Sequence, residues 1–195
     1  MIDGTYEGQD VPSDISVLRQ MTNGLCYIHQ NQLVHGDIKP DNVIISTSGQ
    51  IQISSDFGIC KLVLPKDTII MDEYENTALC MAPEILIPYN DPSFDDDVQL
   101  EFTSKSDIFS AGCVFFVFAT RRKGGVHPYG NRRNHLEVLC NIKAKHPVNI
   151  EGEFLTHYFK ETMETYFLYA KQHVQFFVFI YRVIGNFDLH KTLSC

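Results

Sequence analysis

Residues 33–61 read LVHGDIKPDNVIISTSGQIQISSDFGICK, and this stretch decides the fold. Its apolar pair Leu33-Val34 predicts a short strand, and the β-rich runs 43–45 and 51–53 predict a hairpin around a turn at 46–49. The loop between the strand and the hairpin, residues 35–42, carries a carboxylate, an amine and an amide. We therefore predict a loop that presents polar groups, followed by a β-hairpin.

Three polar side chains of this loop suit phosphoryl transfer. Asp37 can accept the proton of an attacking hydroxyl, Lys39 can neutralise phosphate charge, and the amide oxygen of Asn42 can bind Mg²⁺. The hairpin leads to Asp56-Phe57-Gly58, where a second oxygen ligand for Mg²⁺ stands beside a glycine that lets the backbone turn. A capped turn and a surface acid are the alternative interpretations, and the joint spacing of the two motifs argues against them.

The two motifs, in this order, resemble the catalytic loop and the metal-binding turn of the protein kinases. The Asp-x-Lys-Pro-x-Asn pattern is similar to that of the serine/threonine kinases, so the implied acceptor is an aliphatic hydroxyl of a protein. The resemblance implies that Asp37, Lys39, Asn42 and Thr77 are catalytic and that Lys39, Asn42 and Asp56 bind the cofactor. It also implies that Asn42 and Asp56 hold the metal, and that the cofactors are ATP and Mg²⁺.

The same resemblance implies an α+β fold, the mostly helical large lobe of a kinase with a short β-hairpin at the catalytic loop. An amphipathic helix capped by Ser13 or Asp14 is predicted before the loop. No glycine-rich phosphate loop and no strand lysine precede Leu33, so we expect the small lobe to be missing. We assign residues 1–148 to a partial kinase domain and the aromatic-rich residues 149–195 to a divergent tail with no family match.

Two further helices are predicted. An almost wholly apolar helix starts at Ser106, and in the kinases the acid at its start, here Asp107, holds the backbone of the catalytic loop. A short helix over 134–143 carries apolar residues on one side, and these residues are Leu136, Leu139 and Ile142. His35 is expected to be a packed structural imidazole.

Two departures from the kinase pattern affect the expected regulation and substrate loop. Gly36 replaces the arginine usual between His and Asp, so no guanidinium there pairs with a phosphate, and activation by phosphorylation of the segment 59–81 is not expected. Cys80 replaces an aromatic residue shortly before Ala82-Pro83-Glu84, which changes the substrate loop. The sequences of residues 55–61, 106–116 and 125–130 most resemble those of the inositol-requiring kinase-endoribonuclease sensors of the unfolded protein response, and we do not expect the ribonuclease activity of those proteins here.

Composition limits the class of protein. The chain has 195 residues, 44% of them hydrophobic, and a net charge of −8, which favours one globular core and basic substrates over nucleic acid. The six cysteines show no metal-binding spacing and are interpreted as buried, reduced thiols, as in a cytoplasmic protein. No segment is predicted to span a membrane.

Three functions compete on the sequence alone. The first is a serine/threonine kinase domain that transfers the γ-phosphate of ATP to a protein hydroxyl. The second, preferred for the isolated chain, is a truncated lobe without turnover that acts as a binding or regulatory module, with another kinase lobe or a second copy of the chain as its partner. The third is an unstable fragment, which the aromatic tail favours.

Overall fold

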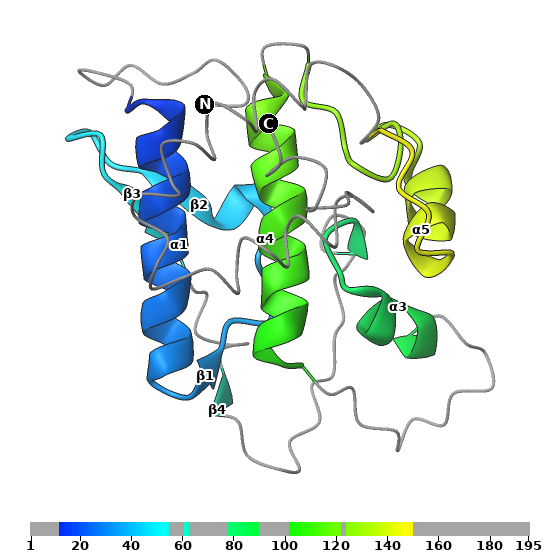
Figure 1. Cartoon of the computed structure of the whole chain (residues 1–195), viewed down its shortest axis with the longest axis horizontal. Helices are drawn as coiled ribbons and strands as arrows, with labels where there is room; N and C mark the ends of the chain where they lie inside the picture. The colour runs from blue at the N-terminus through cyan, green and yellow to red at the C-terminus, as the bar shows by residue number, and fades with distance from the viewer. Residues whose placement is uncertain (1–11, 55–60, 63–77, 90–101, 122–123, 150–195) are drawn as a thin grey trace, which may run out of the picture.

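The computed structural model describes residues 12–54, 61–62, 78–89, 102–121 and 124–149. Two long helices, α1 and α4, lie side by side, and Figure 1 shows the shorter α3 and α5 on the other side of α4. The helices are α1 (Asp14–Gln30), α3 (Pro83–Tyr89), α4 (Ser104–Ala119) and α5 (His135–Lys143). Helices therefore account for most of the regular secondary structure of the described part, as expected.

Helix α1 begins where the sequence predicts. Ser13 is its N-cap, and the Ser13 hydroxyl accepts a hydrogen bond from the main-chain N–H of Ser16 at 3.3 Å. The apolar stripe of the helix is buried, and it consists of Val17, Leu18, Met21 and Leu25. This stripe packs in the same core cluster as helix α4, so α1 is amphipathic and oriented by its apolar face.

Four short strands form two antiparallel pairs around the loop 35–42. Strand β1 (Leu33–Val34) pairs with β4 (Lys61–Leu62), and β2 (Val43–Ile45) pairs with β3 (Ile51–Ile53) with Ile44 opposite Gln52. A 3₁₀ turn over Pro40–Asn42 joins the loop to β2. The predicted hairpin is confirmed in its strands and in its turn.

Helix α4 is the centre of the core, since twelve of its sixteen residues are buried. Our prediction that it starts at Ser106 is wrong by two residues. Thr103 is the N-cap, and the side chains of Thr103 and Ser106 each accept a hydrogen bond from the other residue's main-chain N–H. Ser106 therefore closes the capping box from within the helix.

Helix α5 buries two of the three residues predicted to face the core, Leu139 in part and Ile142 fully, and it does not bury Leu136. Val138 and Ile142 are fully buried and Leu139 is partly buried, whereas 73% of Leu136 is exposed. Residues four apart lie on one face of a helix, while a residue two positions away lies nearly opposite. The face of α5 that contacts the core is thus set by Val138 and Ile142, and the inclusion of Leu136 was wrong.

The C-terminus of α5 contains a strained residue that offers a stability test. Lys145 has a φ of 52°, and the N–H groups of Lys145 and His146 close the helix on the carbonyls of Ile142 and Asn141, each at 2.9 Å. This is the hydrogen-bond pattern in which glycine is usual. We expect Lys145→Gly to raise the free energy of unfolding by about 0.5–1 kcal/mol, measured by urea denaturation.

A matched control lies two residues earlier. Lys143→Gly, inside the last helical turn, should lower the free energy of unfolding by about 0.5–1 kcal/mol, because glycine is unfavourable there. If both substitutions destabilise the chain equally, the left-handed conformation of Lys145 does not limit its stability.

The ends of α1 and α4 are joined by an ion pair. Arg121, which follows α4, contacts both carboxylate oxygens of Asp14, and its guanidinium lies 3.9 Å from the centre of the Phe118 ring. None of the helices that the structure describes has the length and apolar character needed to cross a bilayer. The predicted tail beyond residue 149 lies outside the described residues, and its boundary stays a prediction.

Candidate active site

A buried histidine anchors the loop 35–42. The His35 side chain is buried, its Nε2 donates to the Ser54 carbonyl at 3.1 Å, and its Nδ1 accepts from the Asp37 N–H at 3.2 Å. Ser54 also donates its own N–H to the Asn42 carbonyl at 2.8 Å. His35 is therefore structural, as predicted, and it ties the loop to the chain that leads from the hairpin toward Asp56.

Asp107, in the first turn of α4, also holds the loop through hydrogen bonds to its main chain. One carboxylate oxygen accepts the Gly36 N–H at 2.8 Å, and the other accepts the His35 N–H at 2.8 Å. The second oxygen also accepts a hydrogen bond from Nε2 of His29, in the last turn of α1, at 2.9 Å. The expected role of Asp107 is confirmed by these contacts, and His29 is an addition that the sequence did not suggest.

Gly36 has a backbone conformation that explains its residue type. Its φ is 75°, in the left-handed region where side chains are strained. In this conformation two successive N–H groups, those of His35 and Gly36, point at one carboxylate. Glycine adopts this conformation without strain, and it leaves no guanidinium at position 36.

The loop brings three of the predicted site residues together. The Nζ of Lys39 lies 3.0 Å from Oδ2 of Asp37, and the Nδ2 of Asn42 lies 2.9 Å from the same oxygen. The Asn42 amide also donates to the Asp37 carbonyl at 2.7 Å. The side-chain nitrogen of Asn42 donates both of these hydrogen bonds, so they fix the orientation of the amide group. No described residue donates a hydrogen bond to the amide oxygen.

That orientation fits a metal ligand. An amide oxygen with no donor against it is available to a hard cation such as Mg²⁺, which prefers carbonyl and carboxylate oxygens. Among the described residues no group of three or more His, Cys, Asp or Glu side chains could hold a metal by itself. Asn42 fits as one ligand, and the second predicted ligand, Asp56, lies outside the described residues.

A shallow depression adjoins Asp37 on the side of residues 80–82. It is lined by the loop 35–42, by Cys80, Met81 and Ala82, and by the start of α4. The Cys80 side chain is buried, and burial raises the pKa of its thiol to about 12, so it is protonated and unreactive. The Cys80 side chain therefore forms a small apolar part of the lining, at the position where the kinases usually have an aromatic residue.

Cys60 and Cys195 lie outside the described residues, and the three remaining cysteines bear out the prediction only in part. Cys113 is buried, and burial raises the pKa of its thiol well above the usual value. Cys26 is half-buried, and Cys140, on α5, is exposed, so its interpretation as a buried thiol was wrong. Cys140 is two positions away from each of the buried residues Val138 and Ile142, so it lies on nearly the opposite face of α5.

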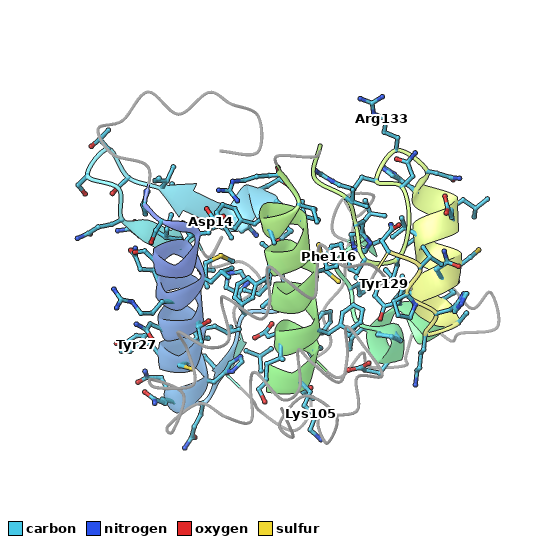
Figure 2. All side chains as sticks on the ribbon, turned by 45° about the horizontal axis from the view of Figure 1, so that its top comes forward. Asp14, Tyr27, Lys105, Phe116, Tyr129 and Arg133 are labelled. Atoms are coloured by element: carbon cyan, nitrogen blue, oxygen red, sulfur yellow. The ribbon has the colours of Figure 1, made fainter. Side chains whose placement is uncertain are left out.

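A second buried histidine, His127, lies beside the segment 78–82. Its Nδ1 accepts the Tyr129 N–H at 3.2 Å, and its buried Nε2 makes no hydrogen bond of standard geometry with the residues that the structure describes. The pKa of His127 is lowered from 6.5 to about 4: burial is the largest cause, the main chain of Leu79 opposes the shift, and the positive charge of Arg132 adds to it. Figure 2 shows Tyr129, which contacts the His127 ring, between α4 and α5.

This histidine should make stability depend on pH. Between pH 6.5 and pH 4 the unfolded chain binds a proton at His127 that the folded chain does not, so acid favours unfolding. We expect this group alone to lower the free energy of unfolding by about 2 kcal/mol from pH 7 to pH 5. Urea unfolding at both pH values should show this loss reduced in His127→Phe and unchanged in His146→Gln, which removes an exposed histidine. An equal loss in both variants would contradict the assignment.

The remaining predicted site residues cannot be placed. Thr77 and Asp56 lie outside the described residues, as does most of the segment 59–81. Asp37, Lys39 and Asn42 are brought together, and these three come from one continuous loop. His29 was missed because nothing in its local sequence separates it from the polar face of α1, and its partner is 78 residues away.

The order of elements and the loop held by Asp107 are those expected of a protein kinase. The family described as "Protein kinase domain" matches residues 11–166, and the chain belongs to this family. Because the match begins at residue 11, it does not confirm that the chain contains the large lobe alone.

Several curated proteins are similar to the chain. The serine/threonine-protein kinase/endoribonuclease ire-1 of Caenorhabditis elegans is 35% identical over 64% of the chain and 12% of its own length. The human serine/threonine-protein kinase/endoribonuclease IRE2 is 37% identical over 59% of the chain and 12% of its own length. Human cyclin-dependent kinase 20 is 33% identical over 65% of the chain and 32% of its own length. The chain thus spans a third or less of each of these relatives.

Proposed function

We propose that the chain carries the large lobe of a serine/threonine protein kinase, which transfers the γ-phosphate of ATP to a hydroxyl group of a protein. The observation that carries this proposal is the cluster in which Lys39 and Asn42 lie 3.0 Å and 2.9 Å from the same oxygen of Asp37. Relatives whose names describe serine/threonine kinases support the same class.

Each residue of the cluster has a distinct task in this proposal. Asp37 accepts the proton of the substrate hydroxyl, and Lys39 neutralises charge on the phosphoryl group as it moves. Thr77 would orient Asp37 and Lys39 toward the acceptor. Asn42 and Asp56 would hold Mg²⁺, which screens the charge of the phosphates. Catalysis here consists mainly of positioning, so the rigidity that Asp107 and His35 give the loop is part of the mechanism.

The assignment to the large lobe rests on the order of the described elements. The long helix α1 is followed by the catalytic loop, then by the hairpin β2–β3, and later by the buried central helix α4. A protein that contains a small lobe, or a second copy of the chain, is the expected partner in forming a nucleotide cleft. Membership in the unfolded protein response, a protein rather than nucleic-acid substrate and a cytoplasmic location remain predictions.

Thermal unfolding with Mg²⁺-ATP tests the nucleotide site in the purified chain. We expect millimolar Mg²⁺-ATP to raise the melting temperature, because a ligand that binds only the folded state stabilises it. Asp56→Ala should abolish the increase, since it removes a metal ligand. Asp37→Asn should keep most of the increase, since a general base acts mainly in the transition state.

Two results would count against the proposal. One is an unchanged melting temperature in the unsubstituted chain with Mg²⁺-ATP. The other is an equal loss of the increase in Asp56→Ala and Asp37→Asn, which would remove the distinction between metal ligand and base. ATP with EDTA in place of Mg²⁺ is the control for binding that does not need the metal.

A further inference from the structure

His127 carries a proton donor into the interior, and its effect on stability does not explain why a histidine stands there. The side chain is buried, and its Nδ1 accepts the Tyr129 N–H at 3.2 Å. A ring nitrogen that accepts a hydrogen bond bears no proton, so the neutral imidazole carries its proton on Nε2. An apolar side chain would pack at this position without burying a donor. The buried donor therefore calls for a role.

The main chain of Leu79 is the group toward which this donor is directed. It favours the protonated form of the His127 ring, as a hydrogen-bond acceptor does. The Tyr129 N–H already occupies the other ring nitrogen, so the main chain of Leu79 faces Nε2. The contact falls short of standard hydrogen-bond geometry. A small displacement of the segment that contains Leu79 is enough to complete the hydrogen bond.

The loop that carries His127 is fixed by hydrogen bonds on its other side. Each of the four main-chain carbonyls of residues 127–130 accepts a hydrogen bond of between 2.7 and 3.1 Å. The donors lie in α5 or follow it, and they belong to Asn141, Val148 and Asn149. The His127 ring is therefore held in place from the side of α5, and its donor is a fixed point for the segment 78–82.

The segment 78–82 forms one wall of the depression beside Asp37. All five of its residues are buried, and Cys80, Met81 and Ala82 line the depression together with Asp37. In the proposed function Asp37 receives the proton of the acceptor hydroxyl, so this wall borders the place of the acceptor. The positions of these three residues then affect how the hydroxyl is aligned with the base.

We propose that His127 is a positioning residue for the phosphoryl transfer, because its Nε2–H holds the main chain of Leu79 and thereby keeps Cys80 to Ala82 in place beside Asp37. The proposal rests on the proposed function, since it concerns the wall next to the proposed base. In this role His127 acts through the segment 79–82. Removing the donor should loosen this wall and leave the rest of the core and the binding of Mg²⁺-ATP unchanged.

The cysteines of the purified full chain provide a test, because one of them lies in this wall. The Cys80 thiol is buried, so N-ethylmaleimide reaches it only when the segment opens. Cys113, buried in α4, reports on opening of the core, and the exposed Cys140 reports on the activity of the reagent. Digestion and mass spectrometry after increasing times give a labelling rate for each cysteine.

Two substitutions separate the donor of His127 from its ring. His127→Phe keeps a planar ring without a donor, so Cys80 should be labelled about tenfold faster while the rate at Cys113 stays the same. His127→Gln keeps an N–H donor near the position of Nε2, so the Cys80 rate should stay within about twofold of that of the unsubstituted chain. His146→Gln, at an exposed histidine, is the control and should change neither rate. Mg²⁺-ATP should change the melting temperature of His127→Phe as much as that of the unsubstituted chain.

Four results would overturn the proposal. The first is an unchanged Cys80 rate in His127→Phe, and the second is an equal increase at Cys80 and Cys113, which would assign His127 to packing of the whole core. The third is an equal increase in the phenylalanine and glutamine variants, which would assign the effect to the ring rather than to its donor. The fourth is a loss of the Mg²⁺-ATP effect in His127→Phe alone. Labelling is done without ATP or an acceptor, so a negative labelling result leaves the Mg²⁺-ATP test of the proposed function unaffected.

Discussion

Replacing Asp107 by alanine is expected to lower the free energy of unfolding by about 3–5 kcal/mol, because three donors lose their shared acceptor. The N–H groups of His35 and Gly36 and the Nε2 of His29 all donate to this carboxylate, and the Asp107 side chain is buried. Donors left unsatisfied in the interior cost more than their hydrogen bonds contributed. Urea denaturation followed by circular dichroism measures the loss.

Two variants make this result interpretable. Asp107→Asn keeps the shape and one acceptor oxygen, so its loss should lie between those of the alanine variant and the unsubstituted chain. Asp41→Ala removes an exposed acid from the neighbouring loop, and its effect should stay within about 0.5 kcal/mol. A loss below about 1 kcal/mol for Asp107→Ala would mean that water or a shifted side chain satisfies the three donors.

The second large effect is expected on rate. In a two-lobed protein, made by joining this chain to the small lobe of a relative, Asp37→Asn should lower kcat about 10²–10⁴-fold. The KM for ATP should stay nearly the same, since proton acceptance by Asp37 contributes in the transition state. Steady-state transfer of labelled phosphate to a protein substrate measures both constants.

Glu137→Gln is the control for this experiment. It removes one carboxylate charge from helix α5, whose described contacts lie away from the catalytic loop, and kcat should not change. A rise in KM for ATP with kcat unchanged in Asp37→Asn would assign Asp37 to nucleotide binding. An unchanged kcat/KM would remove it from the chemistry altogether.

Local features of the chain could be predicted from sequence, because neighbouring residues determine them. Ser13 caps α1, residues 43–53 form a hairpin, and Asp37, Lys39 and Asn42 come together within one loop of eight residues. Each depends on spacing in the sequence and on backbone preferences that hold in any surroundings. Family resemblance added Asp107, whose partners lie 71 and 72 residues away.

Features that depend on distant neighbours could not be predicted. The partner of His29 lies 78 residues further along the chain, and the burial of Val138 rather than Leu136 depends on where α5 meets the core. The start of α4 was misplaced because Ser106 is a good N-cap by residue type, and only the reciprocal bonds with Thr103 show that it lies within the helix.

The clamp at Asp107 also determines when the catalytic loop is assembled during folding. Its hydrogen bonds join residues that are 71, 72 and 78 positions apart in the sequence. Bringing such distant residues together costs chain entropy, and only the contacts then formed offset this cost. These contacts therefore form after the local turns and helices. Synthesis delivers α1 and the catalytic sequence well before α4. A nascent chain that ends before Asp107 therefore contains the catalytic residues without the contacts that hold them in a catalytic arrangement.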